Sequence, residues 1–122
     1  MMNTMILLAL LLLLLHVWFF PLVFSMKHTS WLLGARDEPV DFSLPALRAK
    51  RAAANYLESL PAFLALVLLA KIDGVDLGDI PLYWLALRVV YVGFYLAGTP
   101  VIRSLVWIGS LICLVLMALA FV

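Results

Sequence analysis

The sequence predicts an all-α integral membrane protein, built as an up-down bundle of four transmembrane helices. Of its 122 residues, 67% are hydrophobic and only 12% are charged, and the mean hydropathy is +1.19. These values lie outside the range of soluble globular domains. The length is that of one domain, spanning residues 1–122. A net charge of +1 with few, localised basic residues gives no electrostatic case for nucleic-acid binding.

The first apolar segment, Ile6 to Phe24, contains no formally charged residue and is long enough to cross the hydrocarbon layer. We expect a first helix over residues 4–31. A cleaved signal peptide is the competing interpretation, but the N-terminus MMNTM has no basic residue and no small-x-small site closes the segment. His16 has no second histidine at metal-ligand spacing, which predicts a packed interhelical donor and no metal chemistry.

Polar connections separate the remaining apolar segments. Residues 34–43, GARDEPVDFS, contain glycine, proline and three acids and are expected to form the first loop. The second helix is expected over residues 44–71, with a bend at Pro61. Residues 72–79, IDGVDLGD, carry three aspartates without EF-hand spacing, which predicts a solvated acidic turn and no metal site.

The last two helices are expected over residues 80–98 and 101–122, separated by Thr99 and Pro100. Four helices with such short connections favour up-down order. Basic residues set the orientation, because they flank the first loop at positions Lys27, Arg36, Arg48, Lys50 and Arg51. The excess of basic residues places the first and third loops in the cytoplasm, with both termini on the opposite side.

A polar stripe runs along the expected second helix. At 100° per residue, Arg48, Arg51, Asn55 and Glu58 fall within a sector of about 80°. Two guanidinium groups, an amide and a deeper carboxylate suit an elongated zwitterionic ligand. The alternative is that the basic residues only anchor the helix at the interface. That alternative does not account for Glu58, because a carboxylate inside a spanning segment requires a partner.

A second polar stripe lies on the expected third helix, where Trp84, Arg88, Tyr91 and Tyr95 share one face. Counted from the cytoplasmic boundary, Arg88 and Glu58 both lie about 15 Å deep. We therefore expect a Glu58–Arg88 ion pair, either as part of a site or only as a link between the helices.

The segment Arg48 to Pro61, RAKRAAANYLESLP, resembles the second-helix signature of the MAPEG family, the membrane-associated proteins in eicosanoid and glutathione metabolism. The four-helix layout, the length, the Tyr91-x-x-x-Tyr95 pair and Arg103 at the start of the last helix extend the resemblance to essentially the whole chain, as a member of bacterial type. The resemblance implies a homotrimer that binds glutathione between neighbouring subunits near the cytoplasmic boundary.

By matching position, the resemblance also implies roles for individual residues. The implied glutathione-binding residues are Arg48, Arg51, Asn55, Glu58, Tyr91 and Tyr95. Arg103 is the implied catalytic residue, because a guanidinium beside a bound thiol favours the thiolate, which is the nucleophilic form.

The function expected from these observations is a membrane glutathione transferase or peroxidase that acts on apolar electrophiles or lipid hydroperoxides from the bilayer. A non-catalytic lipid-binding or scaffold member stays open, because Ser59 stands where the glutathione-binding synthases of the family have a tyrosine. A small proton-coupled transporter is the third hypothesis, in which Glu58 titrates without a fixed basic partner.

Overall fold

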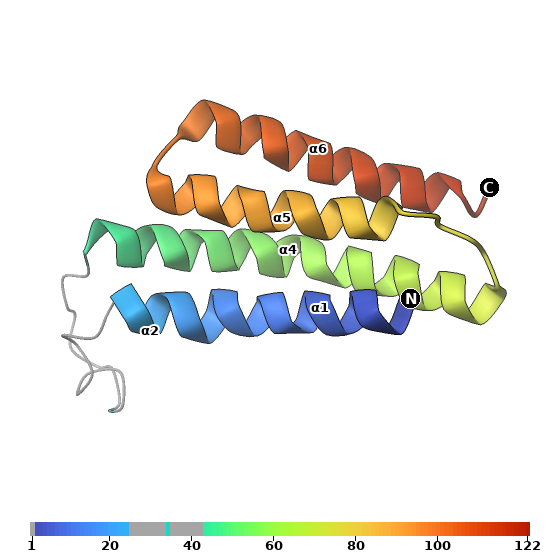
Figure 1. Cartoon of the computed structure of the whole chain (residues 1–122), viewed down its shortest axis with the longest axis horizontal. Coiled ribbons are helices and arrows are strands. Elements are labelled where there is room, and N and C mark those ends of the chain that lie inside the picture. Colours follow the sequence, from blue (N-terminus) through green and yellow to red (C-terminus); the bar gives the residue numbers. More distant parts are fainter. Residues whose placement is uncertain (1, 25–33, 35–42) are drawn as a thin grey trace.

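The computed structural model describes residues 2–24, 34 and 43–122. Within these ranges all regular secondary structure is helical, with no strand, and four helices are long and apolar enough to cross a membrane. Consecutive helices run in opposite directions (Figure 1). The predicted fold class, a four-helix transmembrane bundle in up-down order, is confirmed, and the protein is an integral multi-pass membrane protein.

The first rod consists of α1 (Met2–Leu14), a π-helical turn η1 (Leu15–Phe19) and α2 (Phe20–Phe24). The backbone N–H of Phe20 donates to the carbonyl of Leu15, five residues earlier, as a π turn requires. Pro21 follows this turn and has no backbone N–H to donate. The rest of the helix expected to residue 31, and nearly all of the first loop, lie outside the described residues.

The second rod, α4 (Leu44–Asp73), is one helix of 30 residues with Pro61 inside it. The hydroxyl of Ser43 accepts a hydrogen bond from the backbone N–H of Ala46, at 3.4 Å, which caps the first turn. Gly74, with φ of 69°, ends the helix in the left-handed conformation that a residue without Cβ adopts at little cost. The helix begins at the expected residue and extends two residues beyond the expected end.

The last two rods, α5 (Ile80–Ala97) and α6 (Pro100–Leu119), are joined by Gly98 and Thr99. Gly98 has φ of 77°, and its N–H bonds back to the carbonyls at the end of α5. The hydroxyl of Thr99 donates to the carbonyl of Phe94, at 3.1 Å. This tight turn returns the chain at once, so that the first turn of α6 lies beside the last turns of α5.

Changing Gly98 to alanine is expected to destabilise the protein by about 1–2 kcal/mol, because an L residue is strained at positive φ. A Cβ there would also lie only 2.7 Å from Nη2 of Arg48, so the guanidinium would have to move. Gly93→Ala is the matched control, because Gly93 is helical and nothing lies within 4 Å of a Cβ built on it. Thermal unfolding in detergent should show a loss only for Gly98→Ala; equal effects would contradict this explanation.

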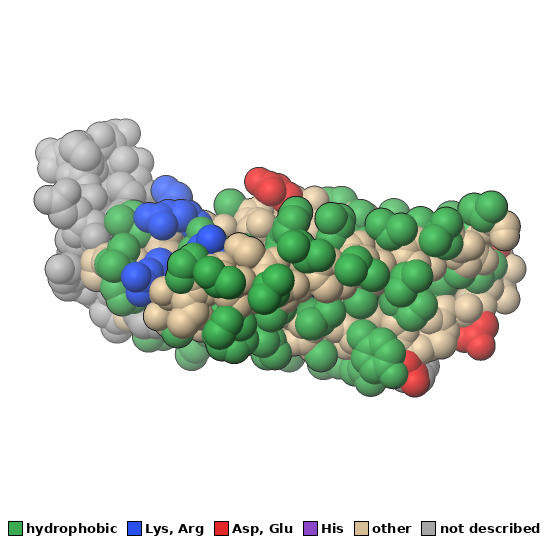
Figure 2. All heavy atoms as spheres, turned by 90° about the horizontal axis from the view of Figure 1, so that it is seen from above, with side chains coloured by type: hydrophobic (Ala, Val, Ile, Leu, Met, Phe, Trp, Pro, Cys, Tyr) green, Lys and Arg blue, Asp and Glu red, His purple; other side chains and the backbone are tan. Residues whose placement is uncertain are grey.

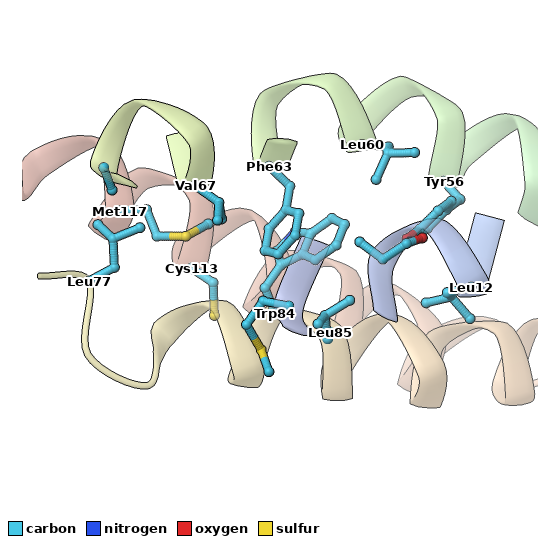
Figure 3. Packing of buried hydrophobic residues seen from close by; sticks show 13 residues of the cluster. Leu12, Tyr56, Leu60, Phe63, Val67, Leu77, Trp84, Leu85, Cys113 and Met117 are labelled. Carbon is cyan, nitrogen blue, oxygen red and sulfur yellow. The ribbon is translucent and has the colours of Figure 1, made fainter. Parts of the chain in front are cut away.

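The buried core lies between α4 and α5 (Figure 3). Trp84 stacks on Phe63 with ring centroids 4.1 Å apart and an interplanar angle of 12°. Met117 and Cys113 from α6, and Leu12 from α1, complete the same cluster. Large apolar side chains also cover the outside of the bundle, as a surface facing lipid requires.

Most of the described Lys and Arg side chains lie toward one end of the bundle, although Lys71 lies in the last turn of α4 at the other end. On the face shown in Figure 2, Lys and Arg side chains gather toward one end, and the acidic side chains lie away from it. The basic residues at this end come from the first turns of two helices: Arg48, Lys50 and Arg51 from α4, and Arg103 from α6. Asp73 ends α4 at the opposite end of the bundle. The predicted polar stripes therefore begin at the basic end.

Candidate functional site

Arg48 joins the start of α4 to the end of α5. Its side chain is half-buried, and Nη1 donates to the carbonyl of Leu96, at 3.4 Å. Its guanidinium lies against Gly98, in the space that a Cβ would fill. Part of its donor capacity is therefore used within the chain, and its position depends on the turn between α5 and α6.

Deeper in the bundle, Asn55 and Arg88 connect α4 to α5. Nη2 of Arg88 donates to Oδ1 of Asn55, at 2.8 Å. Arg88 is fully buried, and its guanidinium carbon lies 4.4 Å from the ring centroid of Tyr91 and 5.6 Å from that of Tyr56. Nε and Nη1 have no hydrogen-bond partner among the described residues. The two aromatic faces therefore hold the cation where conventional acceptors are missing.

Tyr91 and Tyr95 continue this arrangement toward the basic end. Their rings pack edge to face with centroids 5.7 Å apart. The guanidinium carbon of Arg103, one turn into α6, lies 4.5 Å from the ring centroid of Tyr95. The structure thus brings Tyr91, Tyr95 and Arg103 together, with a guanidinium group at each end of the tyrosine pair.

Arg51 and Glu58 lie on the outer surface of α4, where both side chains are exposed. Neither makes a hydrogen bond or an ion pair with any residue that the structure describes. A carboxylate at this depth is costly to leave facing lipid. The partner that this face of α4 requires is therefore not among the described residues.

The expected Glu58–Arg88 ion pair is not formed within the single chain. Arg88 donates to Asn55 instead. The physical reason is rotation about the helix axis: Glu58 is displaced by about 60° from Asn55 on α4, so the turn that directs Asn55 toward α5 directs Glu58 outward. The depth of the two residues was counted from the helical rise, but depth does not determine which side chain faces the neighbouring helix.

Two buried residues beside this arrangement, Tyr56 and His16, were not among the predicted site residues. The hydroxyl of Tyr56 donates to the carbonyl of Ala9, at 2.6 Å. The imidazole of His16 stacks on the Tyr56 ring with centroids 4.4 Å apart and an interplanar angle of 9°. Nδ1 of His16 donates to the carbonyl of Leu12 within its own helix, at 2.8 Å. His16 thus packs between helices as expected, but by stacking and not as an interhelical donor.

In the sequence, the feature that could have pointed to a role for Tyr56 was its position next to Asn55. Tyr56 lies about 100° around the helix from Asn55, on the side that faces α1. Aromatic residues are common in membrane helices, so a lone tyrosine outside the charged stripe gave no reason to assign it a role.

Chemically, the basic end offers guanidinium groups and an amide near the boundary, and a carboxylate about 10 Å deeper than Arg51. Arg51 and Glu58 are free to bind a ligand, as far as the described part of the chain goes. The described residues offer carboxylate-binding and ammonium-binding groups on one helix face, with the Tyr91–Tyr95–Arg103 group on neighbouring helices.

A sequence model of the MAPEG family matches residues 3–122, essentially the whole chain. No individual curated protein and no solved structure matches the chain significantly.

Proposed function

This chain belongs to the MAPEG family, and on that premise we propose that it is a membrane glutathione transferase or peroxidase that acts on apolar electrophiles or lipid hydroperoxides from the bilayer. The family includes glutathione-dependent enzymes of both kinds. The observation that carries the proposal is a pair of charges on α4, Arg51 and Glu58, which are exposed on one face of a membrane helix and have no hydrogen-bond or ion-pair partner among the described residues.

Glutathione has two carboxylates and one ammonium group, and the chemistry of the α4 stripe matches them. In this proposal Arg51, flanked by Arg48, binds carboxylate, and Glu58 binds the ammonium group. Asn55 uses its Oδ1 on Arg88, which leaves its amide N–H groups to donate to the ligand. Tyr91 and Tyr95 contact the ligand from α5.

The site lies between subunits of a homotrimer in this proposal. Glu58 and Arg51 face away from their own bundle, and a neighbouring copy would cover them and separate the carboxylate from lipid. The basic end is placed on the cytoplasmic side, so that the first and third loops are cytoplasmic and both termini lie opposite.

Arg103 is the proposed catalytic residue. When bound, glutathione supplies the sulfur nucleophile. Arg103 stabilises negative charge on that sulfur, and the Tyr95 ring, 4.5 Å from its guanidinium carbon, fixes the orientation of the cation before reaction begins. The apolar surroundings admit the second substrate from the bilayer and exclude water. The protein contributes the orientation of the reactants and the electrostatic stabilisation of the thiolate.

Calorimetric titration of glutathione into the detergent-purified protein tests the proposal. Wild type should bind saturably, and Arg51→Ala and Glu58→Gln should each weaken binding by about tenfold or more, because each removes a charge-assisted hydrogen bond of about 1.5–3 kcal/mol. Lys50→Ala is the matched control: Lys50 is exposed and adjacent to Arg51 but lies off the stripe, so it should bind as wild type does.

Absence of glutathione binding in the wild type would overturn the proposal and leave the lipid-binding or scaffold hypothesis. One observation favours the transporter hypothesis as a second candidate: Glu58 has no basic partner in the described part of the chain, as a titrating carboxylate requires. Proton-driven substrate uptake into vesicles that is lost in Glu58→Gln, without glutathione binding, would identify a transporter.

A further inference from the structure

We propose that His16 and Tyr56 are positioning residues for Arg103, acting through a continuous series of ring–ring and guanidinium–ring contacts, here called the stack, that crosses the bundle from the first rod to α6. The proposal rests on the proposed function for the role of Arg103, whereas the stack itself is independent of any ligand. Its members, in order, are His16, Tyr56, Arg88, Tyr91, Tyr95 and Arg103.

The first rod holds Tyr56 at two points. The hydroxyl of Tyr56 donates to the carbonyl of Ala9, and its ring is stacked on the His16 imidazole. His16 is in turn fixed by its bond to the Leu12 carbonyl. Both side chains are fully buried. The position of the Tyr56 ring therefore depends in part on these contacts with the first rod.

The central link is Arg88, which lies between the rings of Tyr56 and Tyr91. Only one of its nitrogen atoms, Nη2, has a hydrogen-bond partner among the described residues. The remaining orientation of the guanidinium is therefore determined by the two rings. A displacement of the Tyr56 ring removes one side of this clamp and allows the cation to move against Tyr91.

In this proposal, a displacement of Arg88 reaches Arg103 through Tyr91 and Tyr95. Tyr91 packs edge to face on Tyr95, and Tyr95 lies under the guanidinium of Arg103. The side chain of Arg103 makes no hydrogen bond or ion pair with any described residue, so the Tyr95 ring is its principal support among them. Packed side chains of this kind transmit displacement only if the members move together, which requires direct evidence of coupling.

The experiment observes the guanidinium NMR signals of the full-length protein in detergent. Arg88 and Arg103 both lie over tyrosine rings, so ring currents shift their signals away from those of exposed arginines. The signals are assigned from Arg88→Lys and Arg103→Lys. The test variant is His16→Leu, which removes the stacked ring, and His16→Phe restores a ring without the imidazole nitrogens.

Two further variants keep the test informative if His16→Leu folds poorly. Tyr56→Phe retains the ring and removes only the bond to Ala9. Tyr83→Phe is its matched control, because Tyr83 lies on α5 with its side chain exposed and outside the stack.

The proposal requires the Arg103 signal to move in His16→Leu and in Tyr56→Phe, to stay unchanged in Tyr83→Phe, and to return toward wild type in His16→Phe. A shift of the Arg88 signal with an unchanged Arg103 signal would overturn it. For a protein that binds glutathione, His16→Leu should also lower the conjugation rate by about threefold or more with little change in glutathione affinity. A moving Arg103 signal in a protein without glutathione binding overturns only the proposed function.

Discussion

Replacing Arg103 with alanine is expected to lower the rate of glutathione conjugation by about two orders of magnitude, because positioned groups that stabilise charge in the reacting state contribute on that scale. Steady-state kinetics with an apolar electrophile, alongside calorimetry, separate rate from affinity. Affinity should change much less than rate, since the α4 charges Arg51 and Glu58 are proposed to supply most of the binding energy.

Arg103→Lys is the informative control for this prediction. Lysine keeps the positive charge but lacks the planar group that stacks on an aromatic face, so it would lose the arrangement over Tyr95, 4.5 Å away. We expect an intermediate rate. A rate for Arg103→Ala equal to that of wild type would show that Arg103 does not stabilise the thiolate.

Most of the fold could be predicted because membrane helices leave strong signals in a sequence. The lengths of the apolar segments predicted the four spans, and Gly98, which has the positive φ of a helix C-terminus, marked the end of the third helix. The second helix was expected to end at residue 71 and ends at Asp73, before Gly74. The polar stripe on α4 stood out because charges are rare inside spanning segments. These signals are local, and each can be recognised without knowledge of neighbouring helices.

The contacts between helices could not be predicted in the same way. Equal depth in the membrane suggested a Glu58–Arg88 ion pair. The rotation of α4 about its axis instead directs Asn55 toward Arg88, which donates a hydrogen bond to it, and directs Glu58 outward. Rotation is set by packing over the whole helix length, which involves many apolar residues that resemble one another in sequence. The same argument explains why the convergence of Tyr56 and His16 was missed.

The π-helical turn Leu15–Phe19 adds a further reason. A π turn inserts an extra residue into one turn and rotates everything beyond it relative to an ideal helix. His16 lies within this turn, so an ideal periodicity of 3.6 residues per turn does not predict the direction of its side chain, which stacks on Tyr56. The sequence signal was Pro21, which indicates a disturbed turn but not its type.

Replacing Trp84 with alanine is expected to be the most destabilising change in the core. Trp84 is fully buried, stacks on Phe63 at 4.1 Å and lies 5.9 Å from the Tyr56 ring. Truncation would leave a cavity between α4 and α5 (Figure 3). In lipid the transfer of apolar surface from water does not contribute, so the cost comes from lost packing. We expect about 2–4 kcal/mol, measured by equilibrium unfolding in mixed micelles.

Two tryptophan variants show whether packing is the cause. Trp18 is 71% exposed, so Trp18→Ala should change stability by no more than about 0.5 kcal/mol. Trp84→Phe keeps a ring against Phe63 and removes the indole N–H, which has no partner among the described residues; it should cost less than about 1.5 kcal/mol. If Trp84→Ala were as mild as Trp18→Ala, the α4–α5 stack would not be the core. Because Trp84 also contacts the Tyr56 ring, its loss should disturb the support of Arg88 as well as the stability of the bundle.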